Sequence, residues 1–234
     1  MIIQEIIARI TNLYEKGVPS RQSRLSPRHV YNKMLTVRSK LISQEAKKRQ
    51  KINQWSYQTI PCIELIKAEV HECPCLPPLG CEILRSKYPI PKPMTDLNTH
   101  LIQSVTTLDG SVIFSEITWN EKKYKSSNKY TANKPDYYIR NNYLYITHKS
   151  GLKVITLTGL FDDPLKVEDF PSFCKEDCIE CRDCTSPLDK EFPIDNDMID
   201  TLIDMCKQEL IEQFSQMTED KTNNSSDNIP ENSK

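Results

Sequence analysis

The sequence predicts an α+β fold: a helical bundle made from the N- and C-terminal helices, an inserted antiparallel β-domain and an extended C-terminal tail. Three observations support this class. Apolar residues recur at helical spacing near both ends of the chain, they alternate or form short runs over the middle, and the last residues are polar. We therefore expect the bundle at 1–58 plus 161–217, the β-domain at 59–160 and the polar tail at 218–234.

Two helices are expected at the N-terminus. Residues 2–14 place their apolar side chains on one stripe of a helix, which Gly17 ends. Ser26 is a good N-cap, and Pro27 suits the first position of a helix. This second helix is predicted to extend over 26–55.

The middle of the chain is expected to form short antiparallel strands. The candidate strands are 62–66, 82–84, 102–107, 112–119, 137–140, 143–147 and 153–158. Asp109-Gly110 and Asn141-Asn142 predict tight hairpin turns between strands. Prolines crowd the segment 73–95, which we interpret as an extended loop.

Helix is expected to return near the C-terminus. A short turn is predicted at 161–169, and a last helix over 197–217, where apolar residues such as Leu202 and Leu210 recur at helical spacing. Residues 218–234 are polar and poor in apolar residues, so this tail is expected to be disordered on its own.

The composition favours a structural or binding role over catalysis. The 234 residues include 5 glycines and 15 prolines, and no phosphate-binding loop, GxSxG, HExxH or GxGxxG pattern occurs. The four histidines are far apart in the sequence. No run of 18 apolar residues exists, and the apolar N-terminus lacks the basic start and cleavage site of a signal peptide. We expect no catalytic residues and no membrane partner.

Charge is distributed unevenly, although the net charge is −1. Residues 21–51 carry ten Lys or Arg and one acid, whereas 161–234 carry 20 acids against seven Lys or Arg. Either the fold or the assembly could place a basic face against an acidic one, and the alternative is that both are solvated helix faces. The candidate assembly or channel face consists of Arg28, Lys33, Arg38, Lys40, Lys47, Lys48, Arg49 and Lys51. No base-reading motif accompanies it, so only non-specific DNA contact is considered.

The nine cysteines are odd in number and follow no signal peptide, which indicates folding in a reducing cytoplasm. Cys174, Cys178, Cys181 and Cys184 have the spacing C-x3-C-x2-C-x2-C, and four thiolates so close together can converge on one structural zinc. Free surface thiols, and disulfides formed after lysis, are the other two interpretations. No other cofactor is expected.

Three runs of the sequence resemble a family of structural virion proteins of crAss-like tailed bacteriophages. The first spans 13–93, from LYEKGVPSRQ to PIPKP. The others are GSVIFSEITWNEKKYKSSNKYT and KVITLTGLFDDP. The resemblance covers roughly residues 1–165.

The order of helices, β insertion, last helix and tail is also similar to the head–tail adaptors of short-tailed phages. The resemblance implies a virion protein of the tail or neck, assembled in the host bacterial cytoplasm. It implies a ring of identical subunits, twelve in such adaptors, that contacts the portal and neighbouring ring proteins. The alternative is a DNA-contacting accessory protein of packaging, or another tail-ring layer. The resemblance transfers no catalytic residues.

Overall fold

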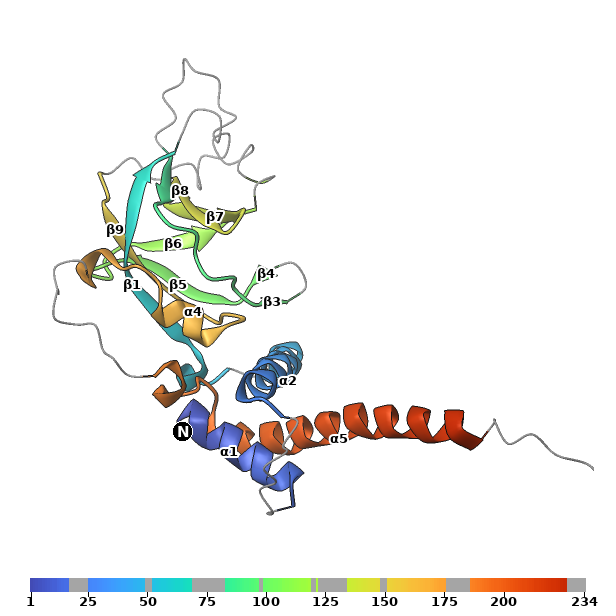
Figure 1. The fold of residues 1–234 in the computed structure, drawn as a ribbon. Helices are drawn as coiled ribbons and strands as arrows, with labels where there is room; N and C mark the ends of the chain where they lie inside the picture. The colour runs from blue at the N-terminus through green and yellow to red at the C-terminus, as the bar shows by residue number, and fades with distance from the viewer. Residues whose placement is uncertain are drawn as a thin grey trace, which may run out of the picture. The chain divides into compact units, whose positions relative to one another are not determined.

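The structure is a computed structural model that describes residues 1–16, 25–48, 52–68, 83–96, 99–118, 121, 134–147, 151–175 and 186–226, with side chains to residue 213 in the last helix. The chain divides into two compact units (Figure 1). The helical unit comprises Met1–Lys51 and Ser186–Lys234, and the barrel unit comprises Ile52–Thr185. The class is therefore mixed α and β, as the sequence predicts.

The described part of the helical unit contains the α-helices α1 (Ile3–Tyr14), α2 (Pro27–Lys47) and α5 (Asn196–Ser226). The Ser26 hydroxyl accepts a hydrogen bond from the His29 backbone N–H at 3.2 Å, which confirms the predicted N-cap of α2. Each helix buries its apolar stripe. The core residues are Ile3, Ile6, Ile7, Ile10, Val30, Met34, Val37, Leu41, Ile42, Ile199, Leu202, Ile203, Cys206 and Leu210.

Two helix ends differ from the prediction. Helix α2 ends at Lys47 instead of reaching residue 55, and a separate 3₁₀-helix, η1, covers Gln54–Ser56. Helix α5 continues to Ser226, so 218–226 is helical where a disordered tail was expected. No glycine or proline interrupts the chain between Asn196 and Pro230, and extending an existing helix is far easier than nucleating one. None of the helices in the described ranges is long and apolar enough to cross a membrane.

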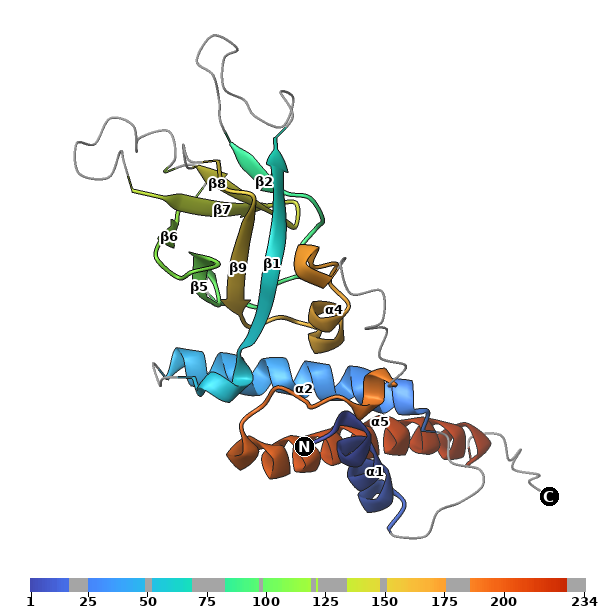
Figure 2. The same cartoon turned by 90° about the vertical axis from the view of Figure 1, so that its left-hand side faces the viewer.

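Seven strands close into a barrel in the order β1-β2-β8-β7-β6-β5-β9. Figure 2 shows β1 extending along this unit beside β9. The strands are β1 (Gln58–Lys67), β2 (Leu84–Ser86), β5 (Ile102–Thr107), β6 (Ile113–Glu116), β7 (Asp136–Arg140), β8 (Tyr143–Thr147) and β9 (Val154–Gly159). A separate pair, β3 (Thr95–Asp96) and β4 (Thr99–His100), was not predicted.

The predicted antiparallel pattern is wrong at one pair, because β6 and β7 are parallel. Ser115 pairs with Asp136 and Glu116 with Tyr137. A parallel pair needs a long connection, and 117–135 provides it. The turn between β7 and β8 is confirmed: Asn141 and Asn142 have φ of 51° and 62°, the left-handed values that a type I′ hairpin requires.

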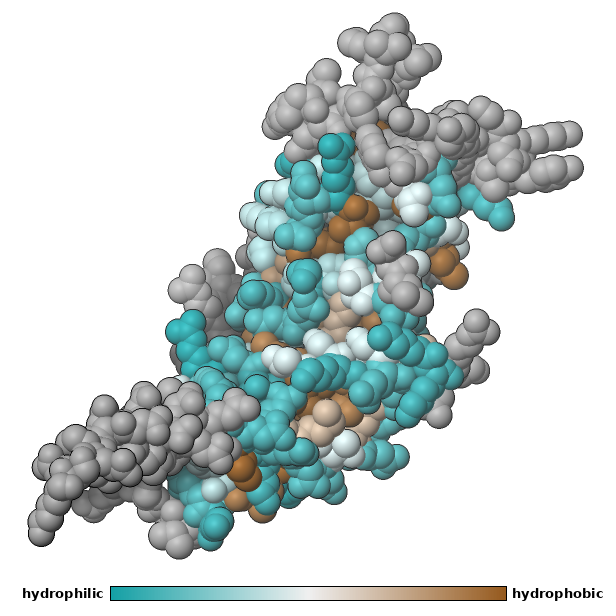
Figure 3. Space-filling model, turned by 90° about the vertical axis from the view of Figure 1, so that its right-hand side faces the viewer, coloured by the Kyte–Doolittle hydropathy of each residue, from teal (hydrophilic) through white to brown (hydrophobic). Residues whose placement is uncertain are grey.

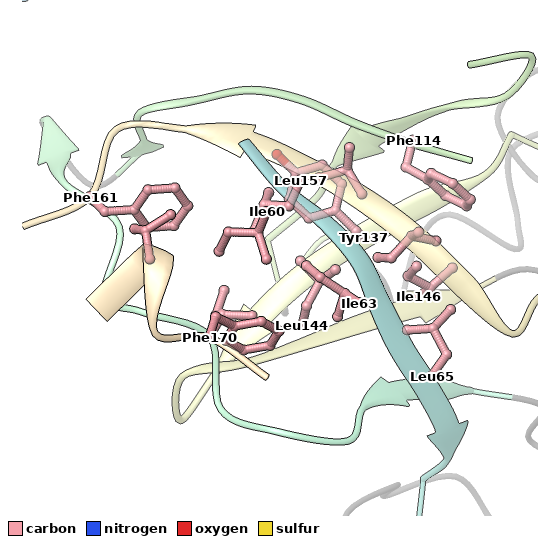
Figure 4. Packing of buried hydrophobic residues seen from close by; sticks show 14 residues of the cluster. Ile60, Ile63, Leu65, Phe114, Tyr137, Leu144, Ile146, Leu157, Phe161 and Phe170 are labelled. Atoms are coloured by element: carbon pink, nitrogen blue, oxygen red, sulfur yellow. The ribbon is translucent and has the colours of Figure 1, made fainter. Parts of the chain in front are cut away.

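The barrel core is filled by alternate residues of the strands (Figure 4). It consists of Ile60, Ile63, Leu65, Ile90, Val105, Phe114, Tyr137, Leu144, Ile146, Ile155, Leu157, Phe161, Val167 and Phe170. The last three belong to helix α4 (Pro164–Glu168) and its flanks, a segment predicted from the sequence to lie in the helical bundle. They lie in the barrel unit instead, because their apolar side chains pack against its strands.

Candidate functional site

Helices α2 and α5 are joined by a charge cluster within the helical unit. The ammonium groups of Lys33 and Lys40 lie 2.9 Å and 2.5 Å from the two carboxylate oxygens of Glu209. The two lysines are seven residues apart, so they lie on the same side of α2, two turns apart. The fold itself therefore brings the basic N-terminal segment against the acidic C-terminal one at this point.

Hydrogen bonds from Lys40 and Lys33 lower the pKa of Glu209 below its ordinary value of 4.5. A carboxyl group with a lowered pKa in the folded state stabilises the fold above its unfolded pKa, and this contribution is lost as the pH falls through the folded pKa. We predict that Glu209→Gln lowers the free energy of unfolding at pH 7 by on the order of 1 kcal/mol. The difference from the wild type should shrink as the pH falls below about 4.5 and vanish in strong acid.

Chemical denaturation of both proteins at pH 7 and pH 3 measures this difference. Glu212→Gln, which removes an exposed acid one turn further along α5, is the matched control. A pH-independent difference between Glu209→Gln and the wild type would contradict the charge cluster.

Arg38 was predicted to belong to the basic face, but it lies in the core. Its side chain is fully buried, its Nε donates a hydrogen bond to the Pro193 carbonyl oxygen at 2.9 Å, and its guanidinium carbon lies 5.8 Å from the centre of the Phe192 ring. Helical spacing places it on the same side of α2 as Met34 and Ile42, both of which are buried. Its position among apolar neighbours was the signal that sequence reasoning missed.

The predicted basic face is therefore smaller than the sequence indicated. Lys33 and Lys40 are paired inside the helical unit, Arg38 is buried, and Arg49 and Lys51 lie outside the described residues. Lys40 is still half exposed although it is paired with Glu209. The exposed cations at the described ends of α2, outside this charge cluster, are Arg28 near its first turn, and Lys47 and Lys48 at its C-terminal end.

The acidic surface of this unit lies on α5. Asp197, Asp200 and Asp204 are all exposed and recur at helical spacing, so they form a stripe along one side of the helix. Part of this stripe borders a hollow of about 440 Å³ between α1 and α5. The hollow is lined by Arg9, Asn12, Leu13, Asp200, Ile203 and Asp204.

Of the predicted metal ligands, the structure describes Cys174, which forms a disulfide with Cys62 across 112 residues, with 5.7 Å between the Cα atoms. Cys62 lies at a bulge in β1, where the pairing with β9 shifts, and it has a left-handed φ of 56°. Cys178, Cys181 and Cys184 lie outside the described residues. Within the described ranges no three His, Cys, Asp or Glu side chains are grouped to hold a metal ion.

The free thiol described in the helical unit, Cys206, is buried. Burial, together with the Glu209 carboxylate, raises its pKa to about 12. Because the thiolate is the reactive and metal-binding form, this cysteine is a core residue and not a candidate nucleophile.

Zinc binding at the C-terminal cysteines stays a prediction, and it now depends on the redox state of Cys174. A thiolate is needed to bind zinc, so Cys174 can serve the metal only when its bond to Cys62 is reduced. We expect the reduced full-length protein to carry about one zinc per chain through Cys174, Cys178, Cys181 and Cys184, and the oxidised protein to lose it. Elemental analysis of both forms measures this. Reduced protein free of zinc, with melting unchanged by chelator, would contradict the metal site.

The comparison with protein families is consistent with the sequence resemblance. The family model described as phage tail ring protein 2, of crAss-like phages, matches residues 5–229. The match spans both the helical unit and the barrel unit. No curated protein matches the chain.

Proposed function

Since the chain belongs to the family of phage tail ring protein 2 of crAss-like phages, we propose that it forms the ring that joins the head portal to the tail and continues the DNA channel. The family is structural and its members are virion components of the tail. A ring implies repeated copies of this chain assembled with other tail components. The observation that carries the proposal is the match over 5–229, which includes every described element but the start of α1.

A closed ring imposes a physical requirement on the surface of the subunit. Each copy contacts its two neighbours through two different faces, which must be complementary to one another. A ring between the portal and the tail also presents surfaces to the layers above and below it. The cations Lys47 and Lys48 at the end of α2 are suited to such contacts, because both are exposed and, among the residues with described side chains, the α5 carboxylate of Glu209 pairs with Lys33 and Lys40 instead.

We predict that Lys47→Gln/Lys48→Gln weakens ring assembly by on the order of 10-fold at low salt, with a smaller effect at high salt. Electrostatic attraction between exposed charges is screened by ions, so the salt dependence identifies its contribution. Sedimentation velocity of the full chain over a range of salt concentrations measures it. Lys16→Gln/Lys67→Gln removes the same charge at exposed positions elsewhere and should assemble as the wild type does. Equal effects of the two double variants would contradict a role for the end of α2.

A second candidate function is a DNA-contacting accessory protein of packaging, which the same exposed cations favour. Cations that contact phosphates release counterions, so DNA binding would weaken steeply as salt rises. Electron microscopy of the purified chain, with and without DNA, separates the two functions. Rings that form without nucleic acid and bind the purified portal support the connector ring. Assembly only on DNA supports the accessory protein and contradicts the connector ring.

A further inference from the structure

The tip of the β5–β6 hairpin exposes two large apolar side chains. Leu108 is 57% exposed and Ile113 is 66% exposed. In the antiparallel pair Thr106 lies opposite Ile113, whereas the next pair, Val105 and Phe114, faces the barrel core. Alternation along the strands therefore turns Ile113 outward, and it places Leu108, two residues after Thr106, toward the same side. We call Leu108, Ile113 and the turn between them the hairpin tip.

Hydrogen bonds within the turn fix the conformation of the hairpin tip. Asp109 Oδ1 accepts hydrogen bonds from the Thr107 hydroxyl and from the Ser111 backbone N–H, and the Val112 N–H donates to the Thr107 hydroxyl oxygen at 3.2 Å. Gly110 provides the left-handed φ of 69° that the turn needs. These hydrogen bonds lower the pKa of Asp109 to about 2, so its carboxylate stays ionised. A preformed tip loses little conformational freedom when a partner binds it.

The hollow between α1 and α5 has the complementary character. Its apolar part is formed by Leu13, which is 44% exposed, and by Ile203, which is 4% exposed. Charged side chains surround this part: Arg9 on one helix, and Asp200 and Asp204 on the other. An apolar centre with a charged rim is the usual anatomy of a protein interface. A volume of about 440 Å³ is sufficient for two aliphatic side chains.

The charges around the hairpin tip match those around the hollow. The tip carries the Asp109 carboxylate, and the exposed Lys153 lies directly before β9, two residues from Ile155, which pairs with Thr107. The rim of the hollow offers one cation, Arg9, and two acids. Between two copies, the Asp109 carboxylate of the tip has a cation, Arg9, to face in the hollow. Lys153 has the two acids of the hollow to face.

We propose that the hairpin tip of one copy of this chain inserts Leu108 and Ile113 into the α1–α5 hollow of the neighbouring copy. This inference rests on the ring function proposed above. The two surfaces are different, which a head-to-tail ring requires, since a closed ring uses one face of each copy against another face of the next. The face of the molecule drawn in Figure 3 is mainly hydrophilic with small separate apolar patches, so burial of such patches in contacts between copies removes apolar surface from water.

Photo-crosslinking between differently labelled copies tests this contact directly. The chain with Leu108→benzoylphenylalanine, unlabelled, is mixed with ¹⁵N-labelled wild-type chain, irradiated, digested and analysed by mass spectrometry. We expect crosslinks from position 108 to labelled peptides that contain residues 9–13 or 200–204. The same group placed at Gln103, an exposed position on β5, is the control. Crosslinks confined to one chain, or directed to other segments of the labelled chain, would overturn the proposal.

Paired substitutions test the energetic role of the tip. Leu108→Asp/Ile113→Asp should weaken self-association by about 10-fold or more, because a few apolar side chains at the centre of an interface carry most of its binding energy. Gln103→Asp/Ser115→Asp adds the same charge at exposed positions on the same two strands and should have little effect. Thermal melting verifies that both variants are folded. Leu13→Asp, which changes the hollow instead of the tip, should weaken self-association in the same way.

The outcomes separate the contact from the ring function. If Leu108→Asp/Ile113→Asp forms rings as strongly as the wild type does, the docking of the tip is contradicted. The proposed connector ring is not contradicted by that result. A wild-type chain that stays monomeric at all concentrations, on and off the portal, would contradict both.

Discussion

Arg38→Ala is expected to lower the free energy of unfolding of the helical unit by about 3–5 kcal/mol. The side chain is fully buried, so its removal leaves a cavity between α2 and the segment that precedes α5. It also removes the donor at 2.9 Å from the Pro193 carbonyl oxygen and the contact with the Phe192 ring. The Pro193 carbonyl oxygen is part-buried, so the loss of this donor adds a penalty to the loss of packing.

Arg28→Ala is the matched control, because it removes the same side chain from an exposed position of the same helix. Its effect should stay within about 0.5 kcal/mol. Arg38→Met fills much of the volume but lacks the hydrogen bonds and the positive charge, so its cost should lie between the two. Denaturant unfolding of the three variants measures these differences. Equal stability of Arg38→Ala and Arg28→Ala would show that Arg38 belongs to the surface and that its assignment to the core is wrong.

Loss of the Cys62–Cys174 disulfide is the second change with a large expected effect. Cys174→Ser should lower the free energy of unfolding of the oxidised barrel unit by about 2–5 kcal/mol, because the bond closes a long loop and restricts the unfolded chain. The folded state should change little. The Ser172 hydroxyl donates a hydrogen bond to the Pro61 carbonyl oxygen at 3.0 Å, which keeps this segment beside β1 without the bond.

The control for this prediction is a reductant. With dithiothreitol present, the wild type and Cys174→Ser should unfold at the same denaturant concentration, since neither then contains the bond. Cys62→Ser should behave as Cys174→Ser does in the oxidised protein. A stability of the oxidised wild type that dithiothreitol leaves unchanged would contradict the pairing of these two cysteines.

Local sequence signals predicted the elements of this fold well. The N-cap at Ser26, the apolar stripe of α1 and the Asn141-Asn142 turn depend on residues a few positions apart, and all three are found in the structure. Strand alternation likewise located β5 at 102–107 and β8 at 143–147.

Contacts between distant parts of the chain could not be predicted in this way. The closure of the barrel depends on β1 pairing with both β2 and β9, and no local pattern contains that information. The same holds for the pairing of Cys62 with Cys174 and for the packing of Phe170 in the barrel core. Each results from long-range packing, which residue type and spacing alone do not specify.

The candidate basic face shows the same limit at the level of single side chains. Its charge was visible in the sequence, but three members have partners inside the chain: Lys33 and Lys40 contact Glu209, and Arg38 contacts Pro193. Only a structure distinguishes a cation that holds two helices together from one that lies outside such pairs. This distinction leaves Arg28, Lys47 and Lys48 as the described cations of α2 with which to test assembly.

A cryo-electron map of the intact virion, with this chain fitted into it, tests the central claim most directly. We expect a closed ring of copies of the chain between the portal and the tail, around the DNA channel. We also expect the hairpin tip of each copy to lie in the α1–α5 hollow of the next. A map in which this chain occurs as single copies, or forms no ring in contact with the portal, would contradict the connector ring.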